Sequence, residues 1–251
     1  MATNTLSYEE YLDCREMDLT VEILHNGSPF IDFWYLCQWL GFSWFDFLMM
    51  FHDHRNEHGE KIKNLYETFR GDSQKGYWDT YEDLQHTVIN NFDKYLENTD
   101  GTNEMSKGKA IAFFRCETEL HDILTANMKK VLETQGQWDK DTALYLQELK
   151  VFCQLRKSNV FDHDKILHGQ FNFDFMALMT TYKGVDPREF KLSKPVAYEF
   201  YVDEKQKAVF SSYLDIYGND SIDGLGRILM RSRMEDLFRS VRAAPTLAAV
   251  S

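Results

Sequence analysis

The chain has 251 residues, 15% of them aromatic, and a formal net charge of −12 at pH 7. An aromatic content this high excludes a disordered chain, and 13 glycines with 4 prolines are too few for an all-β protein with many tight turns. The first 122 residues hold 23 Asp and Glu against 10 Lys and Arg. This half would repel a polyanion, so we expect no nucleic-acid partner.

The N-terminal sequence predicts three helices joined by short turns. Ser7 and Glu10 form an S-x-x-E capping box ahead of apolar residues at helical spacing. Asn26-Gly27 is expected to end this first helix, because both residues tolerate a left-handed cap. Pro29 is then expected at the first position of the second helix, and Ser43 caps the third.

The middle of the chain also has a helical pattern. It predicts helices over 60–70, 79–97, 109–135 and, behind Asp139 as a cap, 139–157. Residues 98–108 are polar and rich in turn formers, which marks them as a loop. We therefore expect a single helical module over 1–242, with a possible division near 98–108, and a flexible tail over 243–251.

The C-terminal third introduces β-structure. Residues 160–184 are expected to form two short pieces around Gly169, and residues 195–202 alternate as in a strand. A helix is predicted from Asp203 through Tyr217, and a final helix from about Ser221 to Arg242. The fold class expected is mainly α, a bundle-like helical module with a short β-strand or hairpin element near 195–202.

The cysteines and the lack of a long apolar run indicate the cellular compartment. No two cysteines have the spacing of a zinc or iron–sulfur motif, and three of the four lie in apolar surroundings: Cys37, Cys116 and Cys153. They are expected to be buried thiols in a reducing compartment. No leader follows Met1 and no run of about 18 apolar residues occurs, so we expect a cytoplasmic protein with no membrane segment.

Gly224-Leu225-Gly226 stands before an arginine-rich segment and raises the question of a phosphate-binding loop. Such loops need further glycines and usually follow a strand, whereas Leu229 occupies the third glycine position and a helix is predicted before this step. Glycines that allow two helices to pack closely are the simpler interpretation.

Three arginines after this step are candidates for partner or ligand binding: Arg227, Arg231 and Arg233. Arg227 and Arg231 are four residues apart and share a helix face. Glu235 and Asp236 are close enough in sequence to pair with part of this charge. The arginines therefore form either an ion-paired, solvated face or a docking site for an acidic partner or ligand.

Two histidine-bearing segments are candidates for chemistry. Asp162, His163 and His168 could place a base beside a carboxylate that orients it, although no nucleophile motif accompanies them. His54 and His58 have the spacing of metal ligands on a helix, but the sequence indicates no third ligand. The aromatic residues Phe171, Phe173 and Phe175 are expected in the core.

Three stretches resemble the region that follows the catalytic barrel in cobalamin-binding radical S-adenosylmethionine proteins. Residues 5–30 are similar to a Ser-capped helix followed by a V-E-I stretch, and residues 146–164 to a helix that ends in an Arg-rich turn and Phe-Asp. Residues 172–241 are similar to the family's C-terminal end, with a Pro-led aromatic strand, a Y-G turn and a G-x-x-R-I-L helix that ends in L-F-R.

The resemblance implies an accessory module that docks a substrate or a partner, the partner being a radical S-adenosylmethionine and cobalamin catalytic subunit. The chain has no CxxxCxxC and no D-x-H-x-x-G motif, so we expect no cofactor in this chain and no catalytic residue of its own. A partner or full-length relative would carry the [4Fe–4S] cluster, S-adenosylmethionine and cobalamin. The alternative is an independent helical ligand-binding protein or enzyme with a His/Asp pocket near 162–168 or a pocket at the arginine face.

Overall fold

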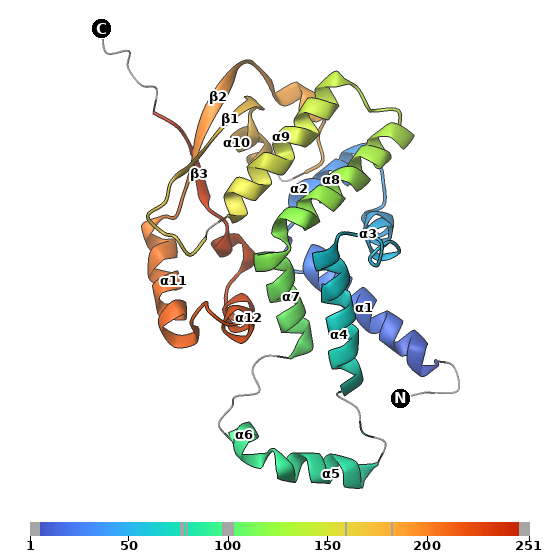
Figure 1. Cartoon of the computed structure of the whole chain (residues 1–251). Helices are drawn as coiled ribbons and strands as arrows, with labels where there is room; N and C mark the ends of the chain where they lie inside the picture. Colours follow the sequence, from blue (N-terminus) through green and yellow to red (C-terminus); the bar gives the residue numbers. More distant parts are fainter. Residues whose placement is uncertain are drawn as a thin grey trace.

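The computed structural model describes residues 6–75, 78, 80–96, 103–158, 160–181 and 183–245. The described chain is mainly helical and carries one small antiparallel sheet, which confirms the predicted fold class (Figure 1). Within these residues no helix is long and apolar enough to cross a membrane.

Four helices form the N-terminal part: α1 (Tyr8–Leu24), α2 (Ile31–Leu40), α3 (Trp44–His52) and α4 (Glu60–Lys75). The predicted capping box is confirmed, because the Ser7 hydroxyl accepts from the Glu10 amide at 3.2 Å and the Glu10 carboxylate accepts from the Ser7 amide at 2.7 Å. Ser43 caps α3 as predicted. The prediction for Pro29 was wrong: α2 begins at Ile31, because Ser28 adopts a φ of 55° and the chain makes a turn first.

The middle helices are α5 (Tyr81–Asn90), α6 (Phe92–Leu96), α7 (Glu104–Arg115), α8 (Glu117–Thr134) and α9 (Lys140–Lys157). Two predicted helices are thus split, at Asn91 and at Cys116, where the backbone leaves helical geometry. Residues 97–102, which include part of the predicted loop and division, lie outside the described residues. The loop prediction was wrong for residues 104–108, which belong to α7 because Asn103 caps a helix that begins at Glu104. Asp139 caps α9 as predicted.

The C-terminal part contains β1 (Leu167–Phe173), α10 (Phe175–Thr181), a 3-10 turn (Pro187–Phe190), β2 (Lys191–Tyr201), α11 (Glu204–Tyr217), α12 (Ile222–Arg231), a second 3-10 turn (Met234–Leu237) and β3 (Ser240–Ala243). The strands pair antiparallel in the order β1-β2-β3, with Gly169 opposite Tyr198 and Phe200 opposite Val241. The predicted strand near 195–202 is therefore the end of a longer one, β2.

Two C-terminal predictions were wrong. Gly169 does not separate two pieces, because β1 runs across it and pairs with β2. The final helix ends at Arg231 rather than Arg242, and the residues after the second 3-10 turn form β3. Pairing with β2 gives these residues backbone hydrogen bonds that outweigh their helical pattern. Residues 246–251 of the predicted tail lie outside the described residues.

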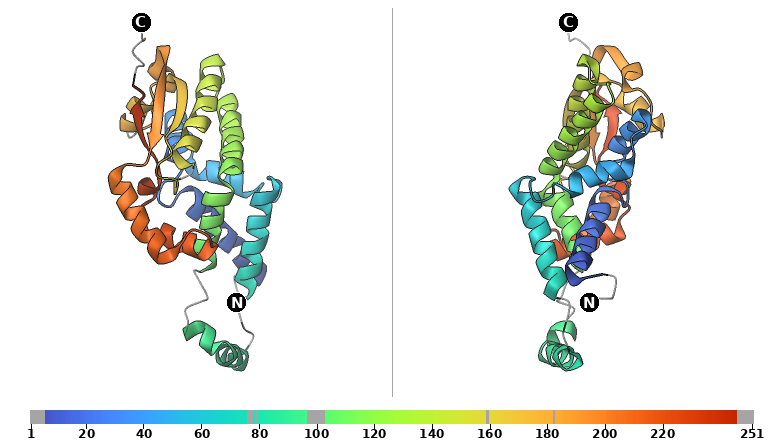
Figure 2. Two further views of the ribbon diagram at one scale, coloured as in Figure 1. Left: turned by 60° about the vertical axis from the view of Figure 1, so that its left-hand side comes forward. Right: turned by 90° about the vertical axis from the view of Figure 1, so that its right-hand side faces the viewer.

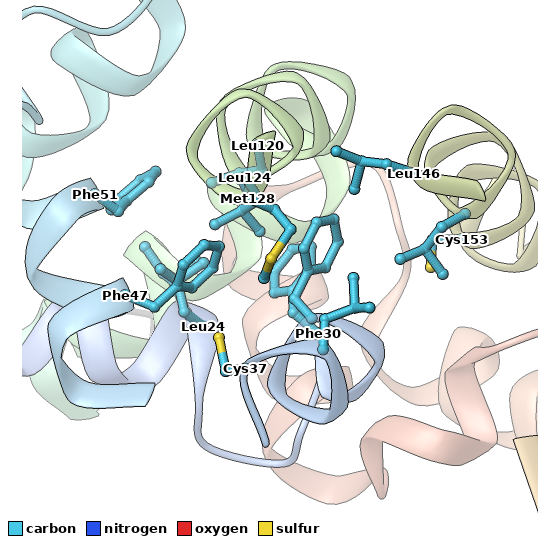
Figure 3. Packing of buried hydrophobic residues seen from close by; sticks show 14 of the residues in the cluster. Leu24, Phe30, Cys37, Phe47, Phe51, Leu120, Leu124, Met128, Leu146 and Cys153 are labelled. Carbon is cyan, nitrogen blue, oxygen red and sulfur yellow. The ribbon is translucent and has the colours of Figure 1, made fainter. Parts of the chain in front are cut away.

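Buried side chains form two clusters. The larger one joins α1–α4 to α7–α9 and the sheet, and Figure 3 shows Leu124 and Met128 of α8 facing Phe30 and Phe47. The predicted core aromatics and thiols are confirmed, since all are at most 2% exposed: Phe171, Phe173, Phe175, Cys37, Cys116 and Cys153. The smaller cluster joins α7 to α11, α12 and the second 3-10 turn, so α7 contributes to both clusters.

The structure shows why a glycine is needed at position 224, before the arginine-rich segment. It lies at the start of α12, where its amide donates to the Ser221 hydroxyl at 3.0 Å. A Cβ at this position would clash with the carbonyl oxygens of Tyr217 and Gly218 at the end of α11. The glycine thus allows a close backbone approach between two helices, which is the packing role predicted from the sequence.

Candidate functional site

The predicted site residues Asp162, His163 and His168 do not converge on a common site. Asp162 is exposed and its backbone carbonyl accepts from Arg239 at 3.0 Å. The His163 ring packs against Phe210 at a centroid distance of 5.6 Å, and burial lowers the pKa of His163. His168 is exposed on β1, opposite Glu199. None of the predicted Asp162, His163 and His168 lines the cleft described below.

The three predicted arginines also separate. Arg227 is half-buried within α12, and Arg231 is exposed at its last position. Arg233 follows the helix and pairs with Asp236 at 3.0 Å and with Glu235 at 2.9 Å, which confirms the predicted internal pairing for this one residue. Because α12 ends at Arg231, the three arginines do not share one helix face. Of the three, Arg233 lines the cleft.

His54 and His58, which have metal-ligand spacing in the sequence, are engaged in other contacts. His54 pairs with Glu57 at 3.1 Å, and the His58 ring bonds the Phe51 carbonyl at 2.9 Å. Among the residues that the structure describes, no group of three or more His, Cys, Asp or Glu side chains could hold a metal ion.

A cleft of about 690 Å³ lies where the N-terminal helices meet the segment after α12. Its walls come from parts of the chain that are far apart in sequence: the α1–α2 turn and α2, α7, α9, α10 and residues 229–238. This is the size and position typical of small-molecule sites. Its apolar lining comprises Ile31, Tyr35, Met179, Leu229, Met234 and Phe238.

Arg156, in the last turn of α9, is the cation of most interest in this cleft. Its guanidinium lies over the Phe238 ring at 5.1 Å and over the Phe152 ring at 5.9 Å. Its Nε is buried, and so is the Ser232 Oγ. In the described part of the chain neither atom has a hydrogen-bond partner. Two buried polar groups of this kind on one cleft are costly, at about 1–3 kcal/mol each.

The other charged groups of the cleft already have partners. Lys109 donates to Glu22 at 2.6 Å and to the Asn26 carbonyl at 3.2 Å, and Arg233 is paired as described above. Asp32 accepts from the Cys153 thiol at 3.4 Å. Burial raises the pKa of Cys153 well above its ordinary value, so this thiol stays protonated and is not a nucleophile.

Arg156 and Ser232 were not predicted as site residues from the sequence. Arg156 stands beside Lys157 at the end of a predicted helix, where basic residues commonly interact with the helix dipole. Ser232 stands between two arginines in the segment that was predicted to be helical. Only the tertiary arrangement brings them to one cleft.

No protein-family model matches the chain, and comparison with curated proteins and with solved structures finds no similar protein. The resemblance to cobalamin-binding radical S-adenosylmethionine proteins therefore stays a prediction.

Proposed function

We propose that the chain is a ligand-binding module whose cleft takes a small organic anion with an apolar or aromatic body. The observation that carries this proposal is the pair of buried donors, Arg156 Nε and Ser232 Oγ, which belong to two residues in the wall of the same cleft and have no protein acceptor among the described residues. A carboxylate or phosphate oxygen would accept from both, and hydrogen bonds to a charged group are the strong ones.

The apolar lining supports the second half of the proposal. Phe238 presents a ring that already stacks on the Arg156 guanidinium, so an aromatic ligand body can extend that stack. Met179 and Met234 add flexible, polarisable side chains that adapt to different ligand shapes. Asp32 and Glu235 also line the cleft. Their charge disfavours polyanions and favours a ligand with one localised negative group.

Calorimetric titration with 1-naphthoate and its neutral analogue 1-naphthamide tests this proposal. We expect 1-naphthoate to bind more tightly than 1-naphthamide. Arg156→Met should weaken 1-naphthoate binding by about 10-fold or more, since a charge-assisted hydrogen bond contributes about 1.5–3 kcal/mol.

Arg242→Met is the matched control for this titration. Arg242 also stacks on an aromatic ring, that of Tyr201 at 4.5 Å, and bonds a carboxylate, that of Glu199 at 2.7 Å, but it lies on β3 and does not line the cleft. Equal affinity of the Arg156→Met and Arg242→Met variants for 1-naphthoate would contradict the proposal.

A second candidate function is the accessory, partner-docking module of a cobalamin-dependent radical S-adenosylmethionine enzyme. The observation that favours docking is the apolar surface of α5 and α6. Tyr81, Ile89 and Leu96 are 72%, 61% and 68% exposed, and no residue described in α5 is buried. Figures 1 and 2 show both helices beyond the ends of α4 and α7, apart from the bundle. Exposed apolar surface of this kind is typical of protein interfaces.

Gel filtration tests this second function with a radical enzyme of that class whose own chain ends at its barrel. Co-elution of the chain with the iron-containing partner is expected, and Ile89→Asp should abolish it because a charge in an apolar interface loses its hydration. Gln85→Asp adds the same charge at another exposed position of α5 and should have little effect. Separate elution of the unmodified chain and the partner would reject the docking function.

A further inference from the structure

A second polar cluster is buried beside α9 and takes no part in the proposed cleft. Lys157 is 8% exposed, and its Nζ lies 3.1 Å from the Nε2 of His121, which is fully buried. The His121 Nδ1 lies 2.8 Å from the Glu117 carbonyl oxygen and 3.0 Å from a Glu117 carboxylate oxygen. Both of these oxygens are acceptors, so Nδ1 carries the hydrogen and Nε2 accepts from the lysine.

Burial favours the neutral form of the Lys157 amine, whereas the aromatic rings beside it favour the ammonium. Its Nζ lies over the Phe30 ring at 3.9 Å and 5.6 Å from the Phe238 ring centre, and among the described residues no carboxylate is within ion-pair distance of it. Burial, the largest effect, lowers the pKa of Lys157. Asp32 and Glu117 raise this pKa, and the charge of Arg156 lowers it by a smaller amount. Burial also lowers the pKa of His121 and keeps it neutral.

A cavity adjoins this cluster. It has a volume of about 370 Å³, and Lys157 and Glu117 are both in its wall. Phe113 and Phe161 supply aromatic surface, while Ser158 and Asn219 supply polar groups. A buried amine, a neutral histidine base and an adjoining cavity are the arrangement that lysine nucleophiles require.

We propose that Lys157 is a nucleophilic amine that condenses with a small aromatic aldehyde entering this cavity. The amine nitrogen forms a bond to the carbonyl carbon, and the π electrons of the C=O bond pass to its oxygen. His121 Nε2 takes one proton from the nitrogen and gives it to this oxygen, which becomes a hydroxyl. His121 Nε2 then takes the second proton from the nitrogen and gives it to the hydroxyl, so that the C–O bond breaks, water leaves and the nitrogen lone pair forms the C=N bond. The product is an imine of Lys157, and the step needs no oxidant or reductant.

Reductive trapping of the intact chain tests this inference. The protein is incubated at pH 7 with benzaldehyde and cyanoborohydride, and modified lysines are located by peptide mass spectrometry. Lys150, in the same helix and paired with Asp122, is the reference. Lys157 should be modified faster than Lys150, because a lowered pKa gives a larger share of neutral amine at pH 7.

Two further measurements distinguish a reactive Lys157 from a lysine that is only packed in the interior. The rate at Lys157 should level off at a lower pH than the rate at Lys150, and His121→Gln should slow modification of Lys157 while Lys150 is unchanged. The inference is overturned if Lys157 in the native chain reacts no faster than Lys150, or reacts only after unfolding in guanidinium. Because both lysines are compared within one unmodified chain, the result does not depend on whether a Lys157 variant folds.

Discussion

Replacement of Arg239 by methionine should lower the free energy of unfolding by about 3–5 kcal/mol, because three carbonyl groups each lose a hydrogen bond worth about 1–1.5 kcal/mol. Arg239 is 1% exposed. Its Nε donates to the Ser158 carbonyl at 2.7 Å, and its terminal nitrogens donate to the carbonyls of Lys165 and Asp162 at 2.6 and 3.0 Å. These bonds hold the turn between α9 and β1 against the segment that enters β3. Methionine preserves the aliphatic stem but leaves three carbonyls without their donor.

Urea denaturation followed by circular dichroism measures this effect. Arg242→Met, three residues along the same segment, is the control, since Arg242 is exposed and its pair with Glu199 contributes little. If Arg239→Met lowers the free energy of unfolding no more than Arg242→Met does, the Arg239 guanidinium does not organise the turn. Arg239→Lys should recover only part of the loss, because an ammonium cannot reproduce the planar fork.

Phe152→Ala should cost about 3–5 kcal/mol of unfolding free energy, the usual range for removal of a fully buried aromatic side chain. Phe152 is 0% exposed in the middle of α9. Its ring stacks on Phe175 at 4.5 Å and contacts Phe171 and Phe200 at 5.6 and 5.3 Å. This one residue therefore joins the helices to both long strands of the sheet, and its removal leaves a cavity between rings that cannot easily close.

Val151→Ala is the control for this prediction, because Val151 is the preceding residue of α9 and is 43% exposed. Phe152→Ala should lower the urea midpoint of unfolding strongly, and Val151→Ala should change it only slightly. Similar midpoints for the two variants would mean that the interface between α9 and the sheet relaxes around the lost ring.

Features set by local chemistry could be predicted from the sequence. Ser7, Asp139 and Asp203 each accept from the amide three residues ahead, so their side chains alone mark the helix starts. The aromatic residues at 171, 173 and 175 could likewise be assigned to the core, because rings of this size are rarely left in water.

Features that depend on tertiary pairing could not be predicted from the sequence. Residues Ser240–Ala243 have no strand pattern of their own and become β3 because β2 presents an edge to them. Arg239 falls within the helix predicted from Ser221 to Arg242, whereas it lies outside any helix and the carbonyls that bind it come from residues 158–165. The candidate site has the same origin. Arg156, Ser232 and Phe238 meet only because α9 packs against the segment after α12, and no sequence spacing records that contact.

Arg156 and Ser232 are proposed to form the anion-binding end of an apolar cleft. A crystal structure of the chain with 1-naphthoate would show this directly. We expect the carboxylate within hydrogen-bond distance of Arg156 Nε and Ser232 Oγ, with the ring system against Phe238 and Met179. A naphthoate bound at another surface, such as the exposed face of α5 and α6, with the cleft empty at saturating concentration, would contradict it.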